Sequence, residues 1–338
     1  MQRVDNPPNP YLGEYRQWLG PPPEAKLTVY EEHADSALAK NDSPDIPFCW
    51  SVNPYRGCQH ACAYCYARRT HEYLGFGAGS DFDTQIVAKV NAPERLAAAF
   101  SRRSWKREVV MFSGVTDCYQ PLEAVYRLTR RCLEVCVQYA NPVRIVTKAY
   151  LVVRDIDVLT ELHCRADVRI CFSMPFADAR IARLIETHAP SPDCQFEAMR
   201  RLAAAGLPVG IIVAPLIPGL NDRDIPALLA RAAACGATTA CYTPVRLPGN
   251  VAPVFLSRLR QVLPLAAAKV ERLVRDLRGG RLNHPEFGVR MRADGAYWES
   301  IERLFETMAT RYGLNCGQPW QRPECGVSAK RAAQLRLF

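Results

Sequence analysis

Residues 53–69 read NPYRGCQHACAYCYARR and hold Cys58, Cys62 and Cys65 in a C-x3-C-x2-C spacing. Spacing this tight lets three thiolates reach one metal centre from a single loop. A [4Fe–4S] cluster is usually held by four thiolates, so three would leave one iron open to an external ligand. Two other interpretations stay open: a zinc site with His60 as a further ligand, or chance clustering in a chain with 14 cysteines.

Short apolar runs alternate with longer amphipathic segments from residue 46 onward. This alternation is typical of β/α units around a parallel sheet, and β-branched, nearly continuous apolar runs suit strands that are covered on both faces. The predicted strands lie near 48–53, 109–113, 143–147, 168–173, 208–213 and 238–242. The first predicted strand precedes the cysteine loop and the other five follow it, so we expect the loop at one end of the sheet.

Helices fit between these strands, and the sequence therefore predicts an α/β fold with a partial (β/α)6 TIM barrel. One helix begins near Asn91, a suitable N-cap, and another follows Pro121. Further helices are expected near 151–163, 193–205, 223–235, 254–264, 265–277 and 297–312. Functional side chains of such barrels stand in the loops after the C-terminal ends of the strands, so we expect the chemical residues there.

The chain divides into three predicted parts. Residues 1–45 are polar and rich in proline, which predicts an irregular N-terminal extension. Residues 46–250 contain the barrel, and residues 251–338 form a C-terminal helical segment with a polar tail. No apolar run approaches the length of a membrane span and the N-terminus has no apolar signal core. We therefore expect a cytoplasmic protein without a membrane partner, in which most cysteines fill core space.

The formal net charge of +9 is unevenly spread, because residues 1–47 carry −4 and the remainder carries +13. A basic body is compatible with a polyanionic partner such as nucleic acid. Equally, the charges can belong to solvated helix faces. The basic clusters that could meet phosphates are Arg102, Arg103, Lys106 and Arg107, and Arg278, Arg281, Arg290 and Arg292.

The cysteine loop resembles the cluster-binding loop of the radical S-adenosylmethionine (SAM) superfamily. The chain is more narrowly similar to a bacterial group related to spore photoproduct lyase. The segments that carry this resemblance are DFDTQIVAKVNAPE (81–94), SGVTDCYQPLE (113–123), IVTKA (145–149), APSP (189–192) and VAPLIPGLND (213–222).

The resemblance implies a [4Fe–4S] cluster on Cys58, Cys62 and Cys65, with SAM bound at the open iron. It implies an enzyme that cleaves SAM to a 5′-deoxyadenosyl radical and abstracts hydrogen from a substrate, chemistry that the cofactor supplies. It also implies a reducing electron donor such as flavodoxin or ferredoxin. Nucleic acid is the substrate that the kinship and the basic body favour.

The resemblance also assigns cofactor contacts to residues that follow the predicted strands. Lys148 matches a lysine that meets the SAM carboxylate, and an ammonium suits that anion. Ser113, Thr116 and Asp117 match polar groups near the SAM amino group, and Ser173 matches a serine on the ribose or carboxylate. The remaining contacts, with the adenine, are expected from Tyr64, Ala214, Pro215 and Ile217. Without the family context, these polar residues could be ordinary turn formers.

Two positions depart from the family pattern. Gln195 stands where relatives carry an arginine, which weakens any carboxylate contact there. Gly114 aligns with the hydrogen-donor cysteine of the lyase, so repair by the same route is not expected. Cys118 lies close by and is the candidate for a catalytic thiol, although a small buried residue at a turn is the simpler interpretation. Cys316 and Cys325 could join an auxiliary cluster.

Two other functions are compatible with the sequence. A radical SAM enzyme of this kind could instead act on a peptide or a small metabolite. A protein that binds nucleic acid through a metal-bearing loop without catalysis is the alternative from another class. SAM binding separates this alternative from both enzyme hypotheses.

Overall fold

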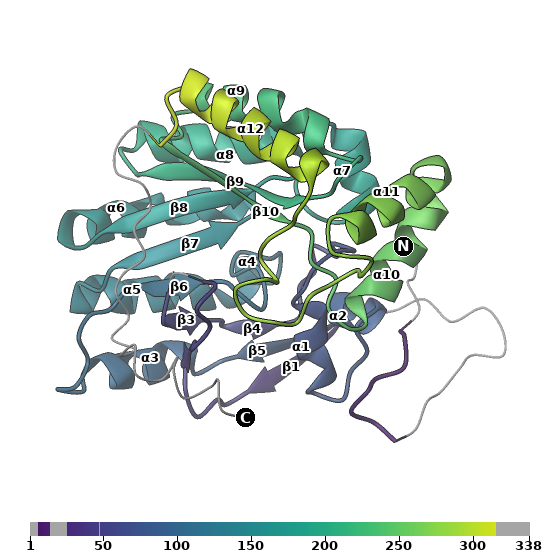
Figure 1. Ribbon diagram of the computed structural model, residues 1–338. Coiled ribbons are helices and arrows are strands. Elements are labelled where there is room, and N and C mark those ends of the chain that lie inside the picture. The colour runs from purple at the N-terminus through teal and green to yellow at the C-terminus, as the bar shows by residue number, and fades with distance from the viewer. Residues whose placement is uncertain (1–5, 14–25, 47, 316–338) are drawn as a thin grey trace, which may run out of the picture.

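The computed structural model describes residues 6–13, 26–46 and 48–315, and its main feature is a seven-stranded sheet. The strand order is β10-β9-β8-β7-β6-β3-β2 (Figure 1). The six strands from β10 to β3 in this order pair with their neighbours in parallel. Strand β2 (Leu38–Lys40) pairs with β3 in antiparallel at the edge of the sheet. The parallel strands are β3 (Trp50–Val52), β6 (Val110–Phe112), β7 (Val143–Thr147), β8 (Val168–Ser173), β9 (Val209–Leu216) and β10 (Thr239–Pro244). All six predicted strands are confirmed.

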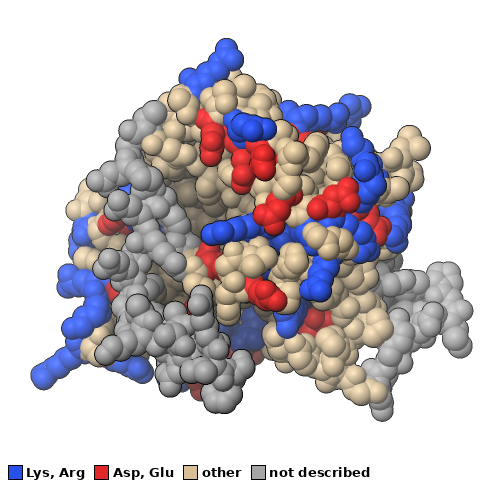
Figure 2. All heavy atoms as spheres, in the orientation of Figure 1, with Lys and Arg blue, Asp and Glu red and all other residues tan. Residues whose placement is uncertain are grey.

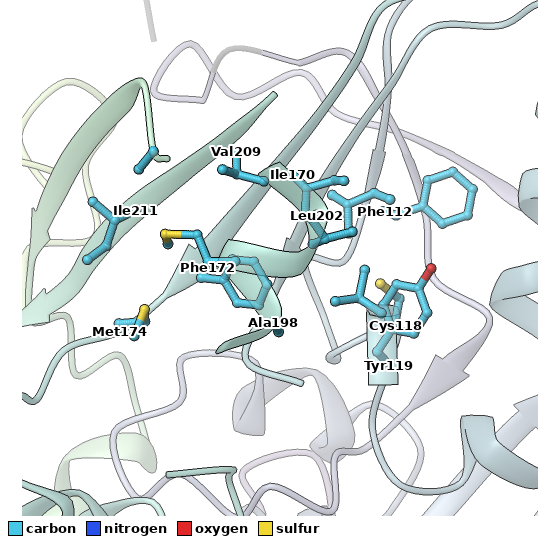
Figure 3. Close-up of a cluster of buried hydrophobic side chains, with 14 of the residues drawn as sticks. Phe112, Cys118, Tyr119, Ile170, Phe172, Met174, Ala198, Leu202, Val209 and Ile211 are labelled. Carbon is cyan, nitrogen blue, oxygen red and sulfur yellow. The ribbon is translucent and has the colours of Figure 1, made fainter. Parts of the chain in front are cut away.

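Alternate side chains on these strands face different surroundings. Val143, Ile145 and Phe172 belong to the main hydrophobic core beneath the helices. Figure 3 shows this core, in which Phe172 and Ile170 lie with Ala198 and Leu202 of α8 (Pro192–Ala204). The intervening side chains face the inside of the barrel, so near the C-terminal strand ends they are available to line a site.

Helices cover the outer face of the sheet, as the alternation predicts. They are α3 (Ala92–Phe100), α5 (Leu128–Tyr139), α6 (Ile156–Arg165), α8 and α9 (Ile225–Ala234), with 3₁₀ turns η1 (Tyr150–Asp155) and η2 (Asp222–Asp224) before α6 and α9. The C-terminal segment contributes α10 (Val251–Val262), α11 (Pro264–Asp276) and α12 (Ala296–Arg311). Helix α12 packs on α9 (Figure 1). None of the helices in the described ranges is long and apolar enough to cross a membrane.

The prediction for Asn91 is correct in position but not in mechanism. Helix α3 begins directly after Asn91, yet the Asn91 side chain makes no capping hydrogen bond. Instead, its amide oxygen accepts a hydrogen bond from the Ala34 backbone N–H at 2.9 Å, and its amide nitrogen donates to the Ala34 carbonyl at 3.0 Å. Asn91 therefore fastens the N-terminal extension to the barrel.

The expectation of an irregular extension over residues 1–45 is wrong for its later part. Strand β1 (Thr28–Glu32) pairs with β5 (Gln85–Lys89), and β5 pairs with β4 (Tyr55–Arg56) in a second, three-stranded sheet. Most residues of β1 are exposed, so its sequence shows little apolar patterning. The pairing with β5, which lies more than fifty positions further along the chain, makes β1 a strand.

One predicted helix is divided in two, and one helix is additional to the predicted ones. The helix after Pro121 is divided into α4 (Glu123–Tyr126) and α5, because Arg127 takes a left-handed conformation with φ of 52°. The carboxylate of Glu123 accepts hydrogen bonds from the Thr129 N–H at 2.9 Å and from Arg154 at 2.7 Å, which stabilises the break. A further helix, α7 (Ala179–Ile185), follows β8 and was not predicted.

His71 in α1 (Arg68–Glu72) is buried and predicts a pH-dependent stability. Its ring stacks on Phe76 with centroids 5.0 Å apart, and burial lowers its pKa from 6.5 to about 4. The unfolded chain therefore binds a proton more readily than the folded chain, so stability is full above pH 6.5 and falls as the pH drops toward 4. We expect a loss of up to about 3 kcal/mol over this window.

Urea unfolding at a series of pH values measures this effect. His71→Phe should flatten the profile between pH 6.5 and 4, whatever it does to stability at neutral pH. His33 is exposed, and His33→Gln is the matched control that should leave the profile unchanged. An unaltered profile in His71→Phe would show that other groups govern the acid response.

Candidate active site

One cavity of about 280 Å³ opens at the C-terminal ends of the parallel strands. Inward-facing strand residues form its wall, among them Met111, Val146, Ser173 and Ile212. The cavity is also lined by ten of the residues that the sequence analysis proposed as ligands. These are Cys58, Cys62, Cys65, Tyr64, Ser113, Thr116, Asp117, Lys148, Ala214 and Pro215. Ser173 is a further proposed ligand, so the candidate residues lie together at the C-terminal ends of the strands.

The cysteine loop runs from β4 to α1 and is shaped by Gly57. Gly57 has φ of +79°, and a Cβ at this position would come within 2.9 Å of both the Ile86 side chain and the Phe82 carbonyl. Only glycine fits such a position without strain. The next residue, Cys58, donates its backbone N–H to the Phe82 carbonyl at 2.9 Å. The loop is thus pressed against α2 (Ser80–Thr84) at its start.

Arg68 holds the other end of the cysteine loop. Its side chain is 1% exposed and donates to the Cys62 carbonyl at 2.9 Å and to the Gly79 carbonyl at 2.7 Å. It also forms an ion pair with Asp83 at 2.8 Å. Several hydrogen bonds to one buried guanidinium restrict the loop strongly. The sequence analysis did not identify this role, because Arg68 looks like an ordinary basic residue after the motif.

The chemistry of the three thiols fits an iron–sulfur cluster. All three line the same cavity, and burial raises the pKa values of Cys62 and Cys65, so cationic iron is needed to hold them as thiolates. Within the described ranges, no three His, Cys, Asp or Glu side chains are grouped so that they could hold one metal ion. A [4Fe–4S] cluster does not need such a group, because each thiolate binds a different iron.

Thr116 and Gln120 connect the loop after β6 to the cysteine loop. The Thr116 hydroxyl donates to the Gly57 carbonyl at 2.6 Å, and the Gln120 amide donates to the same carbonyl at 3.2 Å. The Gln120 oxygen accepts from the Gln59 N–H at 3.0 Å. Thr116 lines the cavity, but its hydroxyl proton is used to position the loop. The Thr116 hydroxyl therefore positions the cysteine loop, and its contact with a ligand stays a prediction.

Asp117 is the one carboxylate among the described residues that line the cavity, and it is heavily hydrogen-bonded. Its oxygens accept from the Thr147 hydroxyl at 2.7 Å and from the Lys148 backbone N–H at 2.7 Å, and His60 Nδ1 lies 3.4 Å away. Burial acts to raise the pKa of Asp117, but His60 and these hydrogen bonds lower it overall. An ionised carboxylate is therefore held at the cavity wall, where it can accept from an ammonium group.

Lys148 projects from the end of β7 into a buried polar cluster. Its ammonium group lies 2.8 Å from a Glu186 carboxylate oxygen and donates to the Ser173 carbonyl at 2.7 Å. The Tyr64 hydroxyl donates to the same Glu186 oxygen, so Tyr64 and Lys148 meet at one carboxylate, and Ser173 joins the cluster through Lys148. The sequence analysis missed Glu186, since nothing in the segment after α7 distinguishes it from a surface acid.

The turn after β6 has a constrained backbone at Ser113. Ser113 has a backbone φ of 98°, a value that residues other than glycine rarely adopt. Gly114 follows with φ of 136°. The Ser113 hydroxyl donates to the Val146 carbonyl at 2.6 Å, and the Val115 N–H donates to Asn53 at 3.0 Å. These hydrogen bonds fix the conformation of the turn, and the backbone of the turn places Ser113 at the cavity wall.

Cys118 does not line the cavity. Its side chain is 0% exposed and belongs to the main core, where Figure 3 shows it beside Tyr119. Burial raises the pKa of its thiol, and the turn directs Asp117 to the site and Cys118 away from it. The prediction of a catalytic thiol at Cys118 is therefore wrong, and Cys118 is a small buried residue at a turn.

Ile217 and Gln195 are not among the residues that line the cavity. Ile217 is fully buried in the second core cluster, together with Tyr64, so it packs behind the site. Gln195 is buried in α8. Cys316 and Cys325 lie outside the described residues. Ile217 directly follows β9, in which Ala214 and Pro215 line the cavity, so the resemblance placed it near the ligand although its side chain is buried in the core.

The two basic clusters occupy different places. Arg102, Arg103, Lys106 and Arg107 precede β6, so they stand at the N-terminal end of the sheet, opposite the cavity. The second cluster follows α11 and is partly structural, because Arg278 is buried and Arg290 pairs with Asp45. Figure 2 shows Lys and Arg side chains interspersed with Asp and Glu over the face in view. This face carries no uniform basic surface.

Several cavity residues were not proposed from the sequence. Phe48, Tyr66, Thr243, Pro244, Arg246 and Met291 line the cavity wall next to the cysteine loop and β10. Met291 belongs to the loop between α11 and α12, far from the barrel motifs in sequence. No spacing signal could have joined these residues, because only the tertiary fold brings their segments together.

Comparisons with known proteins agree with this architecture. The sequence model of the Radical SAM superfamily matches residues 52–232. A protein of Mycobacterium tuberculosis is 35% identical over 252 residues, which cover 74% of each chain. A Pseudomonas phage M6 protein named radical SAM Nalpha-GlyT isomerase is 25% identical over 277 residues, covering 79% of this chain and 54% of that protein.

Solved structures of spore photoproduct lyase have the same fold. One of them, a single-residue mutant of the lyase, superposes with a TM-score of 0.61 at 20% identity, covering 88% of this chain and 86% of the lyase chain. A second mutant was solved with bound AdoMet and dinucleoside spore photoproduct, at a TM-score of 0.61 and 19% identity. At these identities the likeness concerns the fold alone.

Proposed function

Because this chain belongs to the radical SAM superfamily, we propose that Cys58, Cys62 and Cys65 hold a [4Fe–4S] cluster and that SAM binds beside it in the cavity. The observation that carries this proposal is the cavity at the strand ends, which is lined by the three thiols together with Asp117 and Lys148. A cluster held by these three cysteines would supply the electron for reductive cleavage of SAM and hence the radical chemistry for hydrogen abstraction from a substrate.

The residues around the cavity divide the binding of SAM between opposite charges. Lys148 is the cation that meets the carboxylate of SAM. The Ser173 hydroxyl accepts from the Lys148 ammonium group at 3.2 Å and donates to the Ala214 carbonyl at 3.1 Å, so it orients Lys148 at the SAM site. Asp117 is the anion that meets the amino group. Ala214 and Pro215 at the end of β9, with Tyr64, offer apolar contacts to the adenine.

We further propose nucleic acid as the substrate class and flavodoxin or ferredoxin as the reductant. The fold likeness to spore photoproduct lyase, which was solved with a dinucleoside spore photoproduct, supports the substrate class. Gly114 aligns with the position of the hydrogen-donor cysteine, and the nearby Cys118 is buried, so no thiol of this turn reaches the cavity. The hydrogen must then return to the product from 5′-deoxyadenosine or from another donor.

Anaerobic turnover tests the proposal. Reconstituted protein with SAM and a reductant is expected to form 5′-deoxyadenosine, and an oligonucleotide pool should increase its rate. With deuterated substrate, deuterium should enter 5′-deoxyadenosine. Reconstituted protein that forms no 5′-deoxyadenosine would overturn the enzyme assignment. Formation without any response to oligonucleotides would overturn the substrate class alone.

A further inference from the structure

Arg246 stands out among the charged residues of the cavity because its charge is not balanced within the described part of the chain. It follows β10 and lines the same cavity as Asp117 and Lys148. The other charged side chains are paired, since His60 lies 3.4 Å from Asp117 and Lys148 lies 2.8 Å from Glu186. No described carboxylate lies within ion-pair distance of Arg246.

The surroundings of Arg246 are apolar rather than solvating. One terminal nitrogen of its guanidinium contacts the Met291 sulfur at 3.0 Å, and its centre lies 5.8 Å from the Tyr66 ring. Its Nε is buried without a hydrogen-bond partner among the described residues. Burial lowers the pKa of Arg246, and the neighbouring Arg290 lowers it further. A cation that loses water in this way is stabilised when an anion completes its surroundings.

The nearest acidic side chain cannot serve as that anion. Asp45 is taken by Arg290, whose guanidinium pairs with its carboxylate while also donating to Ser43. The proposed cofactors do not serve either, because SAM and a three-thiolate cluster in its oxidised form carry opposite net charges that cancel. In the proposed function Lys148 meets the SAM carboxylate while it also contacts Glu186 at 2.8 Å, and the variants below test whether Arg246 shares that role. The unbalanced charge of Arg246 therefore remains for the substrate.

We propose that Arg246 is a specificity-determining residue that binds an oxyanion of the substrate, a phosphate ester or a carboxylate, at the mouth of the cavity. The inference rests on the proposed function, which makes this cavity the active site. The fork of a guanidinium suits two oxygens of one anion. Tyr66, which is 50% exposed, and Phe48 supply aromatic surface beside it for the uncharged part of the same molecule.

Binding of paired probes to the reconstituted, SAM-loaded protein tests this proposal. Thymidine 5′-monophosphate against thymidine represents the phosphate source, and N-acetylphenylalanine against its amide represents the carboxylate source. We expect the wild type to bind one of the anions about tenfold or more tightly than its neutral partner. Arg246→Gln should remove this preference, while Arg246→Lys should keep part of it. The pair that shows the preference identifies the source of the oxyanion.

Arg281 is exposed on the neighbouring loop, and Arg281→Gln is the matched control that should keep the preference. SAM affinity, measured by equilibrium dialysis, should change by less than about twofold in Arg246→Gln. Iron content and circular dichroism identify a misfolded variant, in which case Arg246→Lys provides the comparison.

Three results would overturn the inference: equal binding of anionic and neutral probes by the wild type, a preference that survives in Arg246→Gln, or a loss of SAM affinity of about tenfold in that variant. The last would assign Arg246 to the SAM carboxylate. Formation of 5′-deoxyadenosine by the wild type tests the proposed function on its own, because that measurement needs neither probe. A failure of the proposed function can therefore be distinguished from a failure of this inference.

Discussion

Replacing Cys58, Cys62 and Cys65 together with alanine is expected to abolish iron binding and SAM cleavage. Reconstituted wild type should contain about four irons per chain, whereas the triple variant should contain almost none. The reason is that these three thiols line one cavity on a loop that Gly57 and Arg68 hold in place. Iron and sulfide analysis, together with the visible absorbance of the cluster, measures the outcome.

Cys194 offers a matched control for this triple substitution. It is exposed near the start of α8 and remote from the cavity lining, so Cys194→Ala should keep the iron content and the formation of 5′-deoxyadenosine. A triple variant that retains its iron would place the cluster elsewhere in the chain. About eight irons in the wild type would instead indicate a second cluster.

Lys148→Met should weaken SAM binding by about tenfold or more, because a charge-assisted hydrogen bond to the carboxylate is lost. The substitution also leaves Glu186 as a buried carboxylate without its cation, since the two groups lie 2.8 Å apart. We expect it to lower the free energy of unfolding by about 3 kcal/mol. Equilibrium dialysis with SAM and urea unfolding measure the two effects.

The double variant Lys148→Met/Glu186→Gln separates the two roles of Lys148. A glutamine at position 186 keeps the size of the side chain and can still accept from Tyr64, so stability should recover most of its loss. SAM binding should stay weak, because no cation replaces Lys148. If SAM affinity recovered together with stability, Lys148 would serve only to support Glu186.

The barrel could be predicted from the sequence because its signals are local. Each parallel strand is a short β-branched run between amphipathic helices, and this pattern does not depend on distant partners. Strand β1 lacks such a signal, as most of its residues are exposed and its strand character comes from pairing with β5. The break at Arg127 was equally invisible, because it is stabilised by contacts of Glu123 with Arg154 in another segment.

Within the site, sequence and tertiary structure decided different things. The cysteine loop and the residues after the strands could be predicted from the sequence, since Asp117 and Lys148 occupy places that parallel strands bring to one end of a sheet. The side of a turn that each residue faces could not be predicted, because it depends on the packing of the folded chain. That packing turned Asp117 to the cavity and Cys118 to the core.

Glu186 and Arg246 could be found as parts of the site only in the folded structure, because their partners lie in distant segments. The physical reason is that a cavity is made by side chains from many elements. Spacing along one segment records which residues can converge locally, whereas burial and charge balance depend on everything packed around them.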